Sequence, residues 1–181
     1  MSIRALAGGY TLVELLITVA VVSTILSISI PGFSILIESQ RLDSSTDTIG
    51  RAVYLARSEA IKRGQWVTLC LSNDGHQCSG NNPTQLLLFA DQDRTGTPTT
   101  PSEIIHHIPT IQKGLTISYN RPFLRFTPLG HSAGTNGTFT LCTADKNGAM
   151  LIISTLGRMR KAIDYNGDGL VEKTVGDPIR C

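Results

Sequence analysis

The hydrophobic and polar positions divide the chain into two parts. The segment Tyr10–Ile30 is apolar apart from a single charged residue, Glu14. As a helix rising 1.5 Å per residue it would span roughly 30 Å, the thickness of the hydrocarbon core of a bilayer. Residues 5–37 carry only this one charge, whereas residues 39–181 carry 15 basic and 12 acidic side chains. The pattern predicts a transmembrane helix over 10–30, followed by a globular part.

Beyond Pro31 the pattern becomes amphipathic. Apolar residues recur at helical spacing and would line one face of a helix. They are Leu42, Ile49, Val53, Ala56 and Ala60. Charged residues occupy much of the remaining surface, and Gly64 provides a stop. We therefore expect an amphipathic continuation of the helix over 31–64, with its apolar face packed on a sheet.

Residues 65–181 contain seven runs with strand character, separated by Gly-, Pro-, Asn- and Asp-rich loops. The runs are Trp66–Cys70, Gln85–Ala90, Ile104–Ile108, Leu115–Asn120, Phe123–Thr127, Thr138–Thr143 and Ala149–Ser154. Asn147-Gly148, between the last two runs, is a strong hairpin signal. The sequence predicts an α+β fold: one long helix packed on an antiparallel β-sheet that forms a single globular domain over 65–181.

The composition and the absence of known catalytic motifs exclude several classes of function. Apolar residues make up 41% of the chain, which excludes wholesale disorder, and the formal net charge is only +2. Aromatic residues make up 6%, too few to favour a platform on which bases stack. The chain has no G-x-S-x-G, H-E-x-x-H or P-loop motif. We therefore expect no catalytic residues and no enzyme activity.

Four cysteines predict two disulfides if the globular part is exported, although the sequence permits three pairings. Cys70 and Cys78 flank a turn-forming Ser-Asn-Asp-Gly stretch, so a local bridge between them is easy. Cys142 would then join the last residue, Cys181, to the sheet. A zinc site is the alternative, but no C-x-x-C or paired histidine spacing supports it.

The segment Asp164–Gly169 follows the pattern D-x-N-x-D-G, which resembles the start of an EF-hand calcium loop. A full loop has a bidentate Glu in twelfth place, where this chain has Val175, and Glu172 stands ninth. Asp, Asn and Gly also form ordinary turns. We expect no resident cofactor and keep calcium as the alternative, with ligands from Asp164, Asn166 and Asp168.

A cluster of cations follows the last expected strand. Gly157-Arg-Met-Arg-Lys161 places three cations within four residues, and no acidic residue lies between Asp145 and Asp164. In an extended backbone Arg158 and Arg160 project to the same side, where guanidinium groups match phosphate oxygens. With Lys161 and with Lys146 of the expected hairpin turn, they form a candidate site for DNA. The alternative is a soluble basic edge that discourages strand-to-strand aggregation.

The amino terminus resembles the signal of type IV pilins and type II secretion pseudopilins. The residues that carry the resemblance are Gly9, Tyr10, Glu14 and Pro31. It implies that residues 1–9 are a leader, that prepilin peptidase cuts between Gly9 and Tyr10, and that the new terminal residue is N-methylated. Tyr10 stands where phenylalanine is more usual, and the leader carries one basic residue, Arg4.

Glu14 gives this resemblance a physical reason. A lone carboxylate in hydrocarbon is costly, but in a filament it can face the terminal amine of a neighbouring subunit. The helix would anchor the chain in the bacterial inner membrane, with the globular domain periplasmic. After assembly it would form the filament core. The implied partners are other pilins, prepilin peptidase and the membrane.

The residues Gly157-Arg158-Met159-Arg160 resemble the G-R-x-R motif of FimT-like minor pilins, which bind DNA during natural transformation. FimU-like pilins and GspH pseudopilins share much of the same framework. The resemblance therefore implies a minor pilin near the tip of a type IV pilus that binds DNA without sequence preference. The alternatives are a structural minor pilin that initiates pilus assembly and a pseudopilin of type II secretion.

Overall fold

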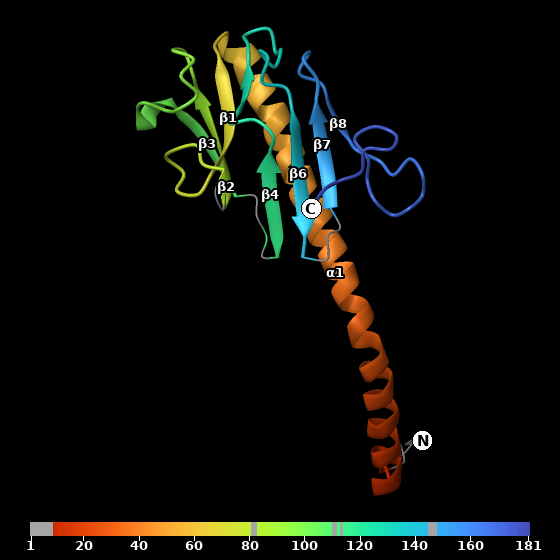
Figure 1. Cartoon of the computed structure of the whole chain (residues 1–181). Coiled ribbons are helices and arrows are strands. Elements are labelled where there is room, and N and C mark those ends of the chain that lie inside the picture. The colour runs from red at the N-terminus through yellow and green to blue at the C-terminus, as the bar shows by residue number, and fades with distance from the viewer. Residues whose placement is uncertain (1–8, 81–82, 110–111, 113, 145–147) are drawn as a thin grey trace, which may run out of the picture. The chain divides into compact units, whose positions relative to one another are not determined.

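The computed structural model describes residues 9–80, 83–109, 112, 114–144 and 148–181, with the backbone alone for residues 28–35. Helix α1 runs from Leu12 to Arg63 (Figure 1). The chain forms two compact units, residues 1–39 and residues 40–181. Each unit is described by itself below.

The first unit contains the amino-terminal half of α1. Thr11 stands at the N-cap position, and its Oγ1 accepts a hydrogen bond from the Glu14 N–H at 3.3 Å. The described apolar side chains of this half, from Leu12 to Leu26, are exposed. Among the described residues, no helix has an apolar stretch long enough to cross a membrane.

The second unit combines the rest of α1 with two antiparallel sheets. The first sheet has the order β3-β2-β1-β5 and the second the order β4-β6-β7-β8. The strands are β1 Val67–Ser72, β2 Gln85–Ala90, β3 Ile104–Pro109, β4 Leu115–Tyr119, β5 Leu124–Phe126, β6 Thr138–Thr143, β7 Gly148–Ile153 and β8 Met159–Lys161. A short 3-10 helix, Pro101–Glu103, precedes β3.

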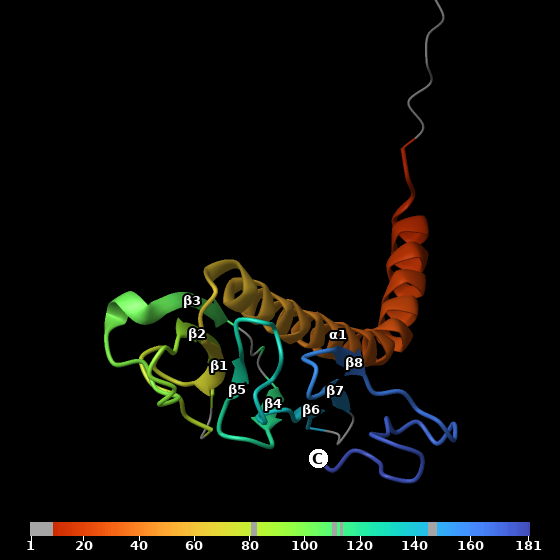
Figure 2. The ribbon, with the colours of Figure 1, turned by 90° about the horizontal axis from the view of Figure 1, so that it is seen from above.

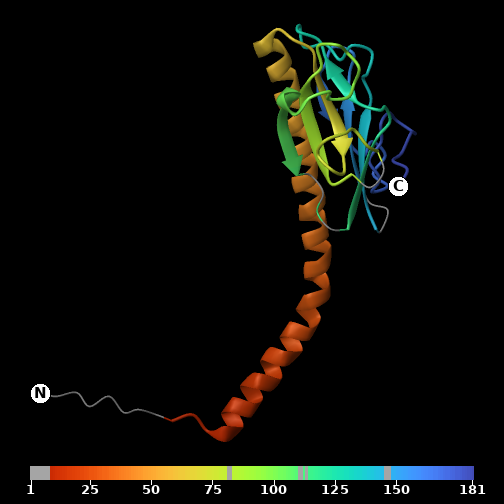
Figure 3. The same cartoon turned by 90° about the vertical axis from the view of Figure 1, so that its left-hand side faces the viewer.

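One hydrophobic core joins this part of α1 to both sheets. Ile49, Val53, Ala56 and Ala60 are buried in it, as the helical spacing predicts, and Leu42 packs against its edge. Both sheets contribute their inward-facing side chains, among them Leu69, Leu88, Phe126, Phe139 and Leu151. Figures 2 and 3 show residues 40–63 of α1 lying along one side of strands from both sheets.

The expected α+β class and the packing of a long helix on antiparallel strands are confirmed. The strands divide into two sheets instead of one because β5 pairs with β1, while β4 pairs with β6. The structure also adds the strand β8, which the sequence pattern did not predict. Both expected disulfides are present, Cys70–Cys78 and Cys142–Cys181.

The two disulfides should differ in their contribution to stability. Cys70 and Cys78 are separated by 8 positions and Cys142 and Cys181 by 39. On the chain-entropy argument, removing the bridges costs about 2.5 and about 4 kcal/mol respectively. We expect the Cys142→Ala/Cys181→Ala variant to unfold at a lower denaturant concentration than the Cys70→Ala/Cys78→Ala variant. The reverse order would contradict the entropic account.

Candidate functional site

The cation cluster lies on the hairpin formed by β7 and β8. In the ladder Ile153 pairs with Met159, Ile152 with Arg160 and Leu151 with Lys161. The turn is closed by backbone bonds from Ser154 N–H to the Arg158 carbonyl and from Gly157 N–H to the Ser154 carbonyl. The Ser154 Oγ also accepts the Arg158 N–H at 3.2 Å. These bonds fix where Arg158 leaves the turn.

Gly157 lets the hairpin approach a neighbouring loop. Its φ is +72°, and an added Cβ would collide with the carbonyl oxygen of Gly130. Arg57 of α1 donates a hydrogen bond from Nη1 to the Gly157 carbonyl at 3.3 Å. The turn that presents the cations is therefore held by the helix and by the Gly130 loop. The contact of Arg57 with the hairpin could not be predicted from the sequence, because the two residues lie far apart in the chain.

Successive side chains of β8 point to opposite faces of the sheet, so the cations that are neighbours in the sequence lie on different faces. Met159 packs on the core side, where a Cβ at Gly50 of α1 would lie 3.1 Å from its Cε. Lys161 shares this side, and its Nζ lies 2.6 Å from Asp47 Oδ1. The hydrogen bond and charge of Lys161 lower the pKa of the Asp47 carboxyl from its ordinary value. Lys161 thus has an acidic partner that the local sequence did not predict, and it faces α1 and not the arginines.

Arg158 and Arg160 are the two cations of the run that have no acidic partner among the described residues. Arg160 is exposed and pairs across the ladder with Ile152 on the outer face of the second sheet. Its Nη2 donates to the Lys173 carbonyl at 2.6 Å. Arg158 is exposed, and its side chain has no hydrogen bond or ion pair with the described residues. Lys146, the fourth expected member, lies outside the described residues.

A shallow hollow extends the outer face beyond Arg160. It is lined by Asn120, Thr138, Thr140, Met150, Lys173, Asp177, Pro178 and Arg180. Because Arg160 bonds to the Lys173 backbone, the guanidinium lies at the border of this hollow. Lys173 and Arg180 therefore add two cations, with Asp177 the acid among them. Lys173 and Arg180 were not predicted from the sequence, because a long irregular segment separates them from the last strand.

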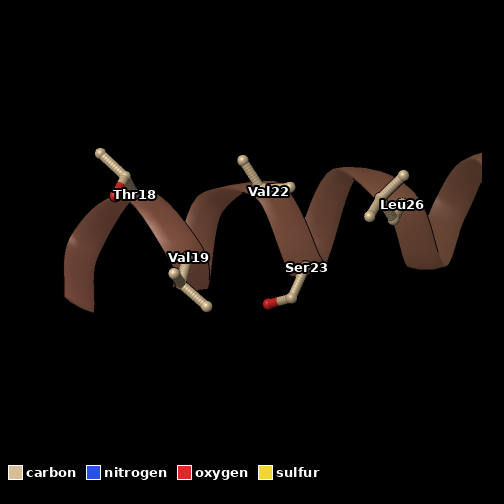
Figure 4. Close-up of a pocket in the computed structure, with 5 residues that line it drawn as sticks. All are labelled: Thr18, Val19, Val22, Ser23 and Leu26. Atoms are coloured by element: carbon tan, nitrogen blue, oxygen red, sulfur yellow. The ribbon is translucent and has the colours of Figure 1, made fainter. Parts of the chain in front are cut away.

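The residues expected to act in processing and assembly lie at the start of the first unit. Gly9 and Tyr10 precede α1, and Tyr10 is 85% exposed. Glu14 is exposed in the first turn, and its carboxylate has no partner among the described residues. Further along, Thr18, Val19, Val22, Ser23 and Leu26 line a shallow hollow on the surface of α1 (Figure 4).

The calcium candidates lie in the segment after β8. Asp164 accepts backbone hydrogen bonds from Gly167 at 2.7 Å and Gly169 at 2.8 Å. These bonds, the one from Gly169 foremost, lower the pKa of the Asp164 carboxyl from its ordinary value. Within the described part of the chain, no three His, Cys, Asp or Glu side chains stand together as a metal site.

Comparison with solved structures finds two similar proteins. The type IV minor pilin FimU of Pseudomonas aeruginosa matches with a TM-score of 0.50 and 20% identity, over 67% of this chain and 93% of that chain. The minor pseudopilin EpsH from the type 2 secretion system of Vibrio cholerae matches with a TM-score of 0.49 and 16% identity, over 67% and 95%. At this identity the FimU match supports the fold alone. No curated protein sequence matches this chain.

The long helix, packed over its second half on two antiparallel sheets, defines a pilin-like protein. Residues 45–157 match the family described as the type II transport protein GspH, and the chain belongs to that family. Its members are structural components of pili and pseudopili, so the chain is a minor pilin or pseudopilin and not an enzyme. The matched region ends at Gly157, so Arg158, Arg160 and Lys161 lie just beyond it.

Gly157 and Gly134 provide a matched test of how the hairpin is held. Both have a positive φ, but a Cβ at Gly134 would meet nothing within 4 Å. We expect Gly134→Ala to cost about 1 kcal/mol of unfolding free energy through backbone strain alone. Gly157→Ala should cost at least about 2 kcal/mol, because it also overpacks the contact with Gly130. Urea unfolding measures both values, and equal losses would show that the close approach is unimportant.

Proposed function

We propose that this protein is a minor pilin that binds extracellular DNA through its phosphate backbone, for uptake in natural transformation. The observation that carries the proposal is the pair Arg158 and Arg160, which the hairpin presents outside the core. Arg158 has no partner among the described residues, and Arg160 uses one nitrogen on the Lys173 carbonyl. Guanidinium groups keep further donors for phosphate oxygens when one is engaged.

The structure supports contact with fewer DNA phosphates than the sequence alone suggested. Lys161 is paired with Asp47, so it adds little positive charge for a phosphate. Lys173 and Arg180 lie on the same outer face as Arg160 and extend the path that a backbone would follow. With two to three phosphates neutralised, the slope of log affinity against log salt would be about −2 for duplex DNA. Binding by one subunit is then weak, independent of sequence and easily reversed by salt.

Base reading has little support in this surface. The hairpin presents side chains from a turn and a three-residue strand, with no helix that could enter the major groove. Tyr119 and Phe139 stack on each other against the core, so they do not form a platform for bases on this surface. A surface of this kind suits capture of DNA by a retracting filament, since capture must be followed by release.

The test is DNA binding by the full chain, kept in solution with a non-ionic detergent. Arg158→Gln/Arg160→Gln should remove most of the affinity for a fluorescent duplex at low salt. It should also bring the salt slope from about −2 towards zero, because each lost phosphate contact reduces the slope by about one. Fluorescence anisotropy across a salt series measures both quantities.

The matched control is Arg41→Gln/Arg121→Gln. Both arginines are exposed, so this double variant changes the net charge equally without touching the hairpin. We expect it to keep the wild-type slope. If both double variants lose the same affinity, net charge and not the hairpin governs binding. If neither does, the protein does not bind DNA through these residues.

Processing and location form part of the same proposal. Gly9 and Tyr10 stand outside the helix, where prepilin peptidase would cut and the new amino terminus would be methylated. The apolar segment 10–30 would hold the chain in the inner membrane before assembly. In the filament, Glu14 would meet the terminal amine of a neighbouring subunit, since nothing described in its own chain neutralises it.

Family membership favours a second candidate function. The match to the type II transport protein GspH supports a structural role in a pseudopilus, and the shared fold of FimU supports one in pilus assembly. A deletion strain separates these roles. We expect transformation to fail while pili persist. Loss of pili would favour the assembly role, and loss of protein secretion with intact pili would favour the pseudopilus.

A further inference from the structure

The segment that follows β8 folds back on itself and encloses a buried acid. An isolated bridge pairs Ile163 with Glu172, and the Glu172 N–H donates to the Ile163 carbonyl at 2.9 Å. A second bridge pairs Glu172 with Pro178. The residues between 163 and 172 therefore form a closed loop, and Glu172 lies beside its beginning.

Glu172 is only 1% exposed, which is unusual for a carboxylate. Its Oε1 accepts hydrogen bonds from the Asn166 amide at 3.3 Å and from the Gly176 N–H at 3.1 Å. Its Oε2 is buried without a hydrogen-bond donor among the described residues. Burial of a polar oxygen without a donor is costly, and a bound cation would supply the missing partner.

A second carboxylate converges on the same place. The Asn166 Nδ2 donates to Asp168 Oδ2 at 3.0 Å as well as to Glu172 Oε1. Two acidic groups thus share one neutral amide donor, Asp168 from the middle of the loop and Glu172 from its end. A divalent cation in the place of that amide group would interact with both carboxylates.

We propose that the loop Asp164–Glu172 binds a calcium ion. Side-chain oxygens of Asp164, Asn166, Asp168 and Glu172 would serve as ligands, with a backbone carbonyl near Leu170 in the seventh place of the loop. An all-oxygen set without Cys or His suits calcium and not zinc. The acids among the described residues do not stand together as a metal site. Binding would therefore require the Asn166 amide to turn away and the carboxylates to move towards the ion.

The path of the backbone answers the main objection from the sequence. An EF-hand closes with Glu in twelfth place, where this chain has Val175, a 77% exposed side chain. Here the bridge between Ile163 and Glu172 brings the ninth residue back to the start of the loop. Gly169, in sixth place with a φ of +88°, makes the sharp turn that such loops require. Glu172 therefore replaces the missing twelfth ligand.

Calcium binding is tested by calorimetry on the full chain in non-ionic detergent, after treatment with a chelator. We expect one site with a Kd of about 10⁻⁴ to 10⁻³ M, as in other extracellular calcium modules, and a melting temperature that calcium raises and chelator restores. Magnesium chloride at the same concentrations should raise it much less. No binding at 10 mM, about tenfold above the weaker limit, would overturn the proposal.

The variants Glu172→Gln and Asp168→Asn should each weaken calcium binding roughly tenfold or more. Asp177→Asn is the matched control, because it removes an acid of the same segment outside the loop and should leave the affinity unchanged. Asp168 is exposed, so its variant decides the matter if the buried Glu172→Gln variant does not fold. Equal affinity for calcium in Asp168→Asn and the wild type would overturn the assigned ligands.

Discussion

The second half of α1 has to bury one apolar stripe against two sheets at once, and the remaining features of the globular unit follow from that constraint. Small side chains make it feasible: Ala52, Ala56 and Ala60 are buried, and Gly50 leaves room for Met159. Ile49 and Val53 fill the space between the sheets. Because β8 docks on this helix through Met159, the helix also determines which way each neighbouring cation points.

The division of the cations is a direct result of strand geometry. Successive side chains of a strand point to opposite faces, so the docking of Met159 sends Lys161 to the helix side and Arg160 to the outer side. Asp47 then completes an ion pair with Lys161 at 2.6 Å. A run of basic residues in a sequence is therefore not one patch of charge. In this protein one member of the run, Lys161, joins the sheet to the helix, and Arg158 and Arg160 have no acidic partner among the described residues.

Local patterns were enough to predict most elements, and non-local pairing accounts for the rest. The stripe from Leu42 to Ala60, the seven longer runs and both cysteine pairs follow from spacing and turn chemistry, and the structure contains them. The division into two sheets was not predictable, because alternation defines the faces of a strand but not its neighbour. Strand β8 was missed for a related reason: with three residues it depends on β7 for its conformation.

The candidate site shows the same limit. Arg158 and Arg160 could be predicted from an i, i+2 spacing, whereas Asp47, Arg57 and Lys173 come from other elements and complete or reduce the site through tertiary contacts. Glu172 is the clearest case. Its ninth place in the loop gives no sign that it lies beside the start of the loop, and only the backbone bridge to Ile163 shows this.

Hydroxyl side chains in the amino-terminal half of α1 are satisfied within the helix itself, whereas those of the globular unit also bond between elements. In this half of the helix they bond to the carbonyls of the preceding turn: Thr18 to Leu15, Ser23 to Ala20 and Ser27 to Ser23, each at 2.8 Å. These bonds direct the hydroxyl hydrogens of Thr18, Ser23 and Ser27 to the helix backbone, so the three side chains offer fewer donors at the helix surface. The Glu14 carboxylate cannot be satisfied in this way. Glu14 therefore differs from these hydroxyl groups: its carboxylate is exposed in the first turn and has no partner among the described residues.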